Sequence, residues 1–377
     1  MALGVSVVPS TAPPTRGVPT ATDAWFVAGV SDVGDVGEAI AINGLAQFES
    51  LVGPRTAGNI TLWDAMDVFF REGGARAYLS ISRAGADLDD ALGFFPEGLG
   101  PGQVSVIGGT IDSASSILAV NHAVNYNRCA ILDIPASFDP GDAVTELEAY
   151  ADAIEAVDTQ GYAAIFGSYV SVPPPAGAAG GSLRTVTAAP VVAALCARVD
   201  QTGNPNQAAA GRHLPLQYVS SLEHNLTLAN QEIALDFGVN FFAEVYGVLE
   251  NYGFQTTVDQ SPNTPFWQFN CSRMRMAMVA RAKQIGENFL FKTIDGQGAL
   301  AASLKGSLDA MMLEFYAAGA VYGRTPAEAF FVDTGPGVNT IDSISAGQLR
   351  AVCSAVLSLH AKAVEIELVS VPVGGTA

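Results

Sequence analysis

The sequence predicts an α/β fold, in which parallel strands alternate with helices. Short apolar runs typical of buried strands recur between residues 24 and 172, and segments with helical spacing of their apolar residues separate them. Strands connected by helices of this length favour parallel pairing with right-handed crossovers. With 377 residues, 49% of them hydrophobic and 15% charged, the chain is long enough for two domains or for one large α/β unit with an appended region.

Residues 1–22 predict an extended arm, because four prolines lie among small and polar residues and leave no apolar stripe. Within this arm, residues 4–8 are expected to form one short strand. The first buried strand is expected at residues 24–30, which are almost entirely apolar.

The segment around residues 62–70 predicts an amphipathic helix. Its apolar residues recur at helical spacing, and three charged residues fall on the opposite face. The apolar set is Leu62, Met66, Phe69 and Phe70, and the charged set is Asp64, Asp67 and Arg71. Gly73 and Gly74 then end the helix before a strand over residues 75–82.

From Gln103 onward, strands and helices alternate regularly. We expect strands at residues 103–107, 129–134 and 162–172, with helices at residues 112–125 and 140–157 between them. The second helix has clear start signals, since Asp139 is a preferred N-cap residue and Pro140 suits the first helical position.

The segment 173–181 is rich in proline, glycine and alanine, and it is either a linker or a loop packed against a neighbour. Beyond it we expect helices near residues 187–199 and 227–237, and strands near 216–221, 241–246 and 248–256. After a second proline-containing break at 261–265, two long helices are expected at about 271–291 and 301–320. Strand segments and a final strand at 363–369 follow them.

The charge balance argues against nucleic-acid binding. The chain has 37 acidic and 18 basic residues, a net charge of −19, and lacks the basic surface that binds phosphates. Its start does not resemble a signal peptide and no apolar stretch approaches about 18 residues, so we expect a soluble chain made in a cytosol, without membrane insertion. The cysteines are far apart in sequence and are expected to be buried free thiols rather than metal ligands. They are Cys129, Cys196, Cys271 and Cys353.

The best catalytic candidates are three carboxylates, Asp133, Asp139 and Asp142, just past the end of a predicted parallel strand. Sites of α/β proteins lie at such strand ends, and grouped carboxylates can hold Mg²⁺. Against this reading, Asp139 is accounted for as a helix cap and Asp142 as a first-turn acid that the helix dipole favours. The sequence has no phosphate-binding loop or nucleophile elbow, and no cofactor is expected. A metal-dependent α/β hydrolase is the alternative reading.

Both chain ends have the pattern of strands that pair with other copies. Residues 364–368 alternate strictly between apolar and acidic side chains, and the N-terminal arm carries a lone strand. Such strands can complete sheets in neighbouring subunits. The residues expected to do so are Val5, Val7, Val8, Val364, Ile366 and Leu368. These features favour an assembly protein over an enzyme.

Several motifs, taken in order along the chain, resemble the contractile tail sheath proteins of bacteriophages and together cover most of the sequence. The C-terminal motifs are Gly319-Ala-Val-Tyr-Gly-Arg-Thr-Pro-Ala-Glu-Ala-Phe-Phe-Val-Asp333, Asn339-Thr340, Gly347-Gln-Leu349 and residues 362–368. The N-terminal and central motifs are Phe26-Val-Ala-Gly29, Phe48-Glu-Ser-Leu-Val-Gly53, Phe69-Phe-Arg-Glu-Gly-Gly74, Leu132-Asp-Ile-Pro135 and the segment 173–181 that leads to 194–200.

The resemblance implies a structural subunit without enzymatic activity or cofactor. It implies an extended arm at residues 1–22, an outer α/β domain at 23–260, an inner, tube-facing α+β domain at 261–362 and an exchanged C-terminal strand at 363–377. Sheath subunits form rings of six that stack helically around a tube, and contraction drives that tube through the host envelope. The implied partners are further copies of the chain, the tail tube protein, and the baseplate and tail terminator proteins.

The resemblance also points to a tube contact. In some relatives, basic residues on the helix before the Gly-Arg-Thr-Pro segment hold an acidic tube, whereas here Lys305 on that helix is balanced by Asp309 and Glu314. Arg273, Arg275 and Lys283 on the preceding helix are the alternative cations. The implied location is the tail sheath of a virion assembled in the host cytoplasm. A phage-derived particle, such as a bacteriocin or an injection system, is the other open setting.

Overall fold

The computed structural model describes residues 22–138, 145–176, 181–202, 205–261 and 264–362. Its largest element is a seven-stranded sheet with the order β10-β6-β5-β4-β1-β3-β2. The strands are β1 (Ala24–Val30), β2 (Ile40–Ile42), β3 (Arg76–Ser82), β4 (Gln103–Ile107), β5 (Cys129–Asp133), β6 (Ala163–Phe166) and β10 (Val239–Asn240). All neighbours run parallel except β2, which pairs antiparallel with β3 at one edge. The predicted parallel α/β fold is confirmed.

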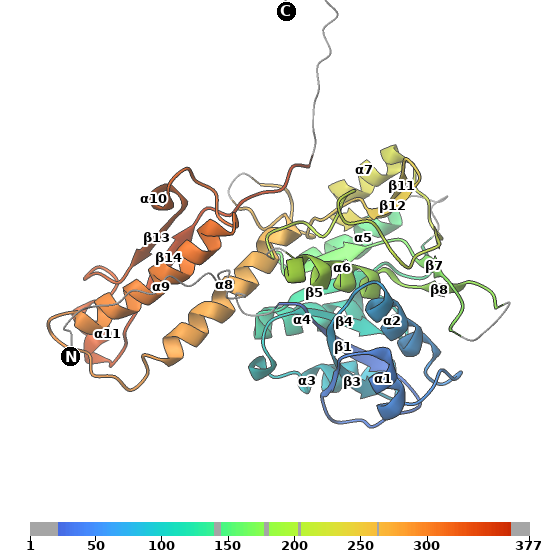
Figure 1. The fold of residues 1–377 in the computed structure, drawn as a ribbon, viewed down its shortest axis with the longest axis horizontal. Coiled ribbons are helices and arrows are strands. Elements are labelled where there is room, and N and C mark those ends of the chain that lie inside the picture. The colour runs from blue at the N-terminus through green and yellow to red at the C-terminus, as the bar shows by residue number, and fades with distance from the viewer. Residues whose placement is uncertain (1–21, 139–144, 177–180, 203–204, 262–263, 363–377) are drawn as a thin grey trace, which may run out of the picture.

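Helices cover both faces of this sheet and give three layers (Figure 1). One face carries α1 (Leu45–Leu51), α2 (Ile60–Arg71) and α6 (Ala188–Thr202). The other face carries α3 (Leu88–Gly93), α4 (Ser113–Tyr126), α5 (Thr145–Glu155) and α7 (Leu228–Asp236), with the short 3₁₀ helices η1 (Gly85–Asp87) and η2 (Glu97–Leu99) near α3. No helix in the described part of the chain is long and apolar enough to cross a membrane.

The central strands are apolar on both faces because each face meets a layer of helices. In β1, Trp25 and Val27 belong to the core that α2 and α6 line, whereas Phe26 and Ala28 belong to the core that α4 and α5 line. All of β5 is buried. This is why these strands read as continuous apolar runs in the sequence. Burial of each large apolar side chain stabilises the fold by about 1.5–3 kcal/mol.

The single strand expected at residues 162–172 is two strands in two sheets. After β6 the chain turns, and β7 (Val170–Val172) joins β8 (Arg184–Val186) and β9 (Ser221–Leu222) in a three-stranded antiparallel sheet. The turn passes through Gly167, where a Cβ would lie 2.4 Å from the ring of Phe241, so only glycine fits. The strands on either side of the segment 173–181, β7 and β8, pair with each other, so its interpretation as a linker is wrong. Its packing against a neighbour stays a prediction.

The strand expected at residues 216–221 forms only at its last residue, in β9. Glu72 gives the reason, because its carboxylate accepts hydrogen bonds from the N–H groups of Gln217 and Tyr218, each at 2.7 Å. Backbone donors that would pair with a neighbouring strand are thus bound by a side chain.

The strands expected between residues 241 and 256 form the hairpin of β11 (Phe242–Val245) and β12 (Val248–Asn251). Tyr246 and Gly247 connect them with positive φ angles of 50° and 76°. Two positive φ angles are typical of the type I′ turn that two-residue hairpins favour, so this turn fixes the register of the pair.

A second core lies beyond residue 264. There α8 (Phe269–Glu287) and α9 (Ala299–Ala317) form a helical hairpin, and a two-stranded sheet of β13 (Phe330–Asp333) and β14 (Val352–Ala355) packs beside them. The short helices α10 (Pro326–Ala329) and α11 (Ile341–Ser345) flank β13 in sequence. Figure 1 shows this hairpin extending away from the three layers.

Helix α8 belongs to both parts of the molecule. Phe269 and Met276 pack in the core of the three layers, whereas Cys271 and Met274 pack in the second core. The side-chain amide of Asn127, at the end of α4, donates to the carbonyl of Met276 at 3.0 Å. A shared helix therefore joins the two parts.

Candidate assembly site

The sheet of β13 and β14 is paired along one edge of β14. The two strands are antiparallel, with Val332 opposite Cys353. Just past β14, the N–H of Val356 donates to the carbonyl of Ala329 at 2.9 Å, and the carbonyl of Val356 accepts from the N–H of Tyr322 at 2.7 Å. Val356 therefore directs both of its backbone groups toward β13 and the residues before it.

The opposite edge of β14 has no partner among the strands that the structure describes. Successive residues of an antiparallel strand direct their backbone groups to opposite edges. Since Val356 faces β13, the backbone groups of Cys353, Ala355 and Leu357 face outward. This free edge is a template for an added strand.

An apolar groove with a volume of about 260 Å³ borders this free edge. Side chains of α8, α9 and β14 line it, and most of them are apolar. They are Met278, Val279, Ala282, Met311, Met312, Cys353, Ala355 and Leu357, together with Phe266 and Arg275. Methionine side chains adapt to partners of different shape. A strand added to β14 would therefore place alternate side chains in a groove that can accept them.

The outer face of the same sheet exposes apolar side chains. Phe331 is 62% exposed, Val352 48% and Val356 50%. Neighbouring apolar side chains in solvent are typical of an interaction surface. Within the described chain, the sheet thus lacks both an edge partner and a cover on its outer face.

Arg273, predicted as a cation for a tube contact, is fully buried. Its guanidinium donates to both carboxylate oxygens of Asp200 on α6, each at 2.7 Å. The hydroxyl of Thr22 donates to the same carboxylate at 2.7 Å. This ion pair joins α8 to the three layers, so the prediction that Arg273 contacts a partner is wrong.

Arg275 is engaged by its own chain but remains partly exposed beside the groove. It donates to the carbonyls of Gln160 at 2.8 Å and Gly161 at 3.3 Å. Its guanidinium lies 3.8 Å from the ring centre of Tyr162 and 4.3 Å from that of Phe266. A role for Arg275 in a tube contact stays a prediction.

The charged residues expected on α9 form ion pairs. Lys305 and Asp309 are 2.6 Å apart, one helical turn from each other. Glu314 lies 3.7 Å from Arg281 of α8. Exposed pairs of this kind contribute about 0–1 kcal/mol each and weaken with salt. The contact of Lys305, Asp309 and Glu314 with a tube stays a prediction.

Asp133 is a helix-capping residue in the structure. It is buried, and its Oδ1 accepts the N–H of Ala189 in the first turn of α6 at 2.7 Å. Burial raises the pKa of Asp133 to about 7. Asp139 and Asp142 lie outside the described residues. Within the described ranges, no group of three or more His, Cys, Asp or Glu residues is placed to hold a metal ion.

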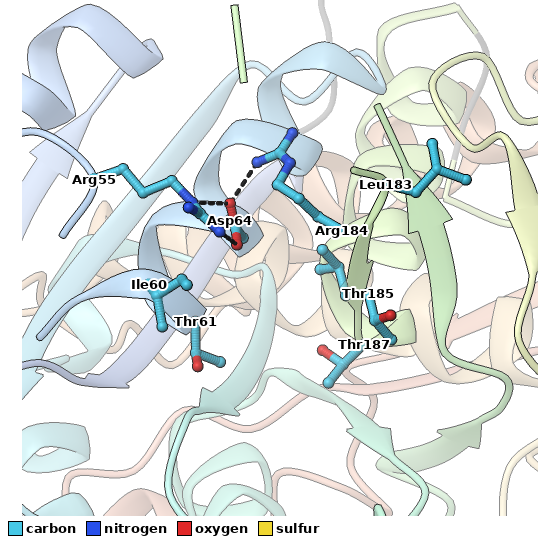
Figure 2. Close-up of a pocket in the computed structure, with 9 residues that line it drawn as sticks. Arg55, Ile60, Thr61, Asp64, Leu183, Arg184, Thr185 and Thr187 are labelled. Atoms are coloured by element: carbon cyan, nitrogen blue, oxygen red, sulfur yellow. Dashed lines mark hydrogen bonds and ion pairs between the residues drawn. The ribbon is translucent and has the colours of Figure 1, made fainter. Parts of the chain in front are cut away.

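A pocket of about 310 Å³ lies between α2 and β8 (Figure 2). In it, Asp64 accepts two hydrogen bonds from Arg55, at 2.8 and 2.7 Å, and also binds Arg184. Arg184 donates to Asp67 as well, at 2.5 Å. The two aspartates face Arg184 and are buried, although the sequence placed them opposite the apolar stripe of α2. Each charged group that lines the pocket has a partner of opposite charge. These ion pairs hold β8 against α2, so none of the charged groups that line the pocket is left to bind a charged ligand.

The cysteines follow the sequence prediction with one exception. Cys129, Cys196 and Cys271 are buried free thiols, and burial raises the pKa of each to about 12. Cys353 is a free thiol but is exposed, because it lies on the free edge of β14. The prediction of burial is wrong for Cys353.

The six residues predicted to exchange between subunits lie outside the described residues. They are Val5, Val7, Val8, Val364, Ile366 and Leu368. The structure thus describes an edge that can accept a strand, and the exchange itself stays a prediction. The groove beside this edge was not predicted, although the methionines Met278, Met311 and Met312 were a sequence signal for an adaptable surface.

Comparison with known structures identifies the fold. No protein-family model matches the chain, and no curated protein matches it in sequence. A chain of the anti-feeding prophage baseplate has 17% identity and a TM-score of 0.74, over 98% of this chain and 99% of that chain. A chain of the contracted PVC sheath complex, from an extracellular contractile injection system, has 15% identity and a TM-score of 0.76, over 98% of both chains. The sheath tail protein of Desulfitobacterium hafniense has 12% identity and a TM-score of 0.51, over 88% of this chain and 93% of that chain.

The chain therefore has the fold of contractile sheath proteins over nearly its whole length. This confirms the fold that the sequence motifs predicted.

Proposed function

We propose that the chain is the structural subunit of a contractile sheath. Its copies form rings of six that stack helically around a tube, and the sheath shortens when the baseplate triggers it and drives the tube through a host envelope. One observation carries this proposal: the free edge of β14 beside its apolar groove, in a chain that shares the sheath fold over 98% of its length. In this role the chain is not an enzyme and needs no cofactor.

The terminal segments of neighbouring subunits complete the sheet in this proposal. The arm at residues 1–22 and the strand at 363–377 supply the added strands. The strict alternation of residues 364–368 suits the free edge, because one face of that strand would enter the groove and the acidic face would stay in solvent. Added strands are held mainly by backbone hydrogen bonds. The subunit bodies can therefore rotate during contraction while the strands stay joined.

The other partners in this proposal are the tube, the baseplate and the tail terminator proteins. The helical part at residues 261–362 is the inner domain and meets the tube, and the three-layer part at 23–260 is the outer domain. Baseplate and tail terminator proteins meet the two ends of the sheath. The polymer is built in the cytoplasm of the producing cell.

A proline at the free edge tests the proposal. Ala355→Pro removes the outward N–H of β14 and sets a ring at the edge, so an added strand loses a hydrogen bond there. We expect a folded subunit that elutes as a monomer from a sizing column and forms no tubes in negative-stain electron microscopy. The matched variant Ala355→Ser keeps the N–H and should form tubes like the unmodified chain. Normal tubes from Ala355→Pro would exclude strand addition at this edge.

The sheath could belong to a phage tail or to a phage-derived injection particle. The likeness is greater to the PVC sheath chain, with a TM-score of 0.76, than to the Desulfitobacterium sheath tail protein, with 0.51. This favours a phage-derived injection particle over a phage tail. Particles purified from producing cells will distinguish them, since nuclease-protected DNA within a capsid identifies a virion and particles without capsid or DNA identify an injection system.

A further inference from the structure

Three buried carboxamides meet where the three layers, the start of α8 and the last described residues come together. Asn206 lies in the loop after α6, Gln268 directly precedes α8, and Asn270 lies in its first turn. Their exposed fractions are 8%, 1% and 0%. Carboxamides at this depth require hydrogen-bond partners. The partners show what this cluster holds.

The partners lie on Ser358 and His360, close to the end of the described chain. Gln268 binds the backbone of His360 twice, since its Oε1 accepts the N–H at 2.9 Å and its Nε2 donates to the carbonyl at 3.0 Å. Asn206 donates to the carbonyl of Ser358 at 2.7 Å. Asn270 accepts from Nδ1 of His360 at 2.9 Å and donates to the carbonyl of Asn206 at 2.9 Å. The carboxamides thus hold residues 358–360 through the backbone groups of Ser358 and His360 and through the ring of His360.

Helix capping does not explain this arrangement. Gln268 is the N-cap residue of α8, yet its side chain makes no capping hydrogen bond. Both of its amide groups bind His360, as a neighbouring strand would bind it. Without residues 358–360 in place, these amide groups would be buried without partners, which costs free energy. The cluster is therefore complete only when that segment is docked.

The docked segment is attached to both parts of the molecule. The N–H of Ser358 donates to the carbonyl of Ala320, beside the second core, at 3.1 Å. Asn206 belongs to the three-layer part, and Gln268 lies at the helix that the two parts share. A force on the chain beyond residue 362 would meet these contacts before it reached β14.

We infer that Asn206, Gln268 and Asn270 form a clamp that fixes the point at which the C-terminal segment leaves the subunit. This inference rests on the proposed function, in which that segment joins neighbouring subunits. Without the clamp, a pull on the segment would break the hydrogen bonds of residues 356–358 to residues 320–329, and then those of β14 to β13, one at a time. With it, the pull passes into α8 and the loop after α6. The three amides are positioning residues, because they set where the exchanged strand starts without being part of it.

Limited proteolysis of the full-length subunit tests the clamp. Leu359 is 54% exposed, so chymotrypsin can reach it, but cleavage requires the docked backbone to open. Gln268→Met keeps the size of the side chain and removes both bonds to His360. We expect cleavage after Leu359 to become about tenfold faster, since cleavage follows the population of the open form. An unchanged rate in a Gln268→Met subunit that is folded by circular dichroism would overturn the clamp.

A pair of variants at His360 keeps the test decisive if Gln268→Met does not fold. His360 is partly exposed near the chain end, so its replacement leaves the cores intact. His360→Ala removes the donor to Asn270, whereas His360→Asn places an amide donor close to the position of Nδ1. Faster cleavage of the alanine variant with a normal rate for the asparagine variant supports the clamp. Equal rates for both variants contradict it.

Assembly experiments separate the clamp from the proposed function. Failure of the unmodified chain to form tubes under any condition would refute the sheath proposal, while the protease rates would still report on the clamp. If the unmodified chain forms tubes, Gln268→Met subunits should form tubes that break under shear flow into shorter pieces, measured by electron microscopy. Gln268→Met tubes with unchanged length after the same shear would refute the role of the clamp in carrying load.

Discussion

At the scale of single residues, the buried charge of Arg128 is stabilised by backbone carbonyls and neutral rings. It is fully buried, and its guanidinium donates to the carbonyls of Phe95 at 2.7 Å and Pro96 at 2.8 Å. A third contact, at 2.6 Å, is with Nε2 of His122, and the ring of Phe26 lies 3.7 Å below the guanidinium. His122 can accept from Arg128 only when it is neutral. Burial, and after it the charge of Arg128, lower the pKa of His122 to about 3.

Protonation of His122 should therefore destabilise the fold. The pKa of histidine in the unfolded chain is about 6.5, above the folded value, so the unfolded state binds the proton first as the pH falls. The contribution of neutral His122 to the free energy of unfolding is complete above about pH 6.5 and is lost as the pH falls toward 3. At pH 5 the loss is about 2 kcal/mol. Urea denaturation at pH 7.5 and pH 5 measures it.

His122→Gln is the control for this measurement, because glutamine keeps a neutral acceptor for Arg128. The contributions of the other titrating groups cancel when the pH-dependent change in the free energy of unfolding of one protein is subtracted from that of the other. Asp133 is one of these, and it acts in the opposite direction, since its raised folded pKa of about 7 makes its contribution fall as the pH rises from 3.8. The same pH dependence in both proteins would contradict the prediction.

At the scale of elements, Arg184 fastens β8 and its sheet to α2. Removing one partner from a buried ion pair costs about 3–5 kcal/mol. Here Asp64 keeps Arg55 and Asp67 keeps Arg71, so we expect Arg184→Met to lower the free energy of unfolding by about 3 kcal/mol, at the low end of that range. Amide hydrogen exchange should become faster in β7 and β8 and stay slow in β4.

Arg184→Lys is the matched variant, because lysine keeps the charge but cannot bridge two carboxylates with a planar fork. The free energy of unfolding of Arg184→Lys should lie between the values for the unmodified chain and for Arg184→Met. Exchange in β7 and β8 that is equally slow in all three proteins would show that the ion pairs do not hold the small sheet.

How far the sequence predicts an element depends on where its partners lie. Strands β1 and β4 were predicted with their observed ends, because buried apolar runs are local signals. The turn at Gly167 was not predicted, since it depends on the distant ring of Phe241. The candidate site follows the same rule. Asp133 caps a helix 56 residues away and Arg273 pairs with a residue 73 positions away, and neither spacing leaves a local pattern.

The terminal segments are the elements on which polymerisation should depend. Residues of the three buried cores lie between residues 24 and 357, so deleting residues 1–20 or ending the chain at Lys362 removes none of them. We expect either truncation to leave a folded, soluble subunit that forms no tubes. Thermal melts, a sizing column and electron microscopy measure these properties. Normal tubes from one truncation would show that its missing segment is not exchanged.

At the scale of the whole molecule, charge is divided unevenly along the chain. Residues 1–263 contain 28 acidic and 9 basic residues, whereas residues 264–362 contain 7 acidic and 9 basic residues and all four lysines. The three-layer part thus carries the negative charge, and the helical part is close to neutral. Like charge keeps the three-layer parts of separate subunits apart in solution. The helical part can approach an acidic partner without that repulsion, which suits its proposed place next to the tube.

Lys305 is the residue through which we expect the helical part to contact the tube. Its side chain is 41% exposed and pairs with Asp309 at 2.6 Å. An exposed ion pair between Lys305 and a carboxylate of the tube would contribute only about 0–1 kcal/mol, but six copies in each proposed ring, repeated along the sheath, multiply this small contribution. Weak contacts of this kind also let a contracting sheath release its tube. We expect Lys305→Glu to impair assembly of the extended sheath on tubes and to spare tube-free polymers, because it places like charges one turn apart on that face.

Cosedimentation with purified tubes at low and high salt measures this contact, since exposed charge pairs are screened as salt rises. The swapped variant Lys305→Asp with Asp309→Lys keeps the ion pair and the net charge but moves the cation one turn along the helix, so it should bind tubes less well than the unmodified chain and better than Lys305→Glu. Lys305→Glu should instead lose most binding even at low salt. Equal loss of tube-free polymers would place Lys305 in the contact between sheath subunits. If neither polymer changes, the tube contact lies elsewhere, and Arg275 is the next residue to test, because Arg273 is buried against Asp200.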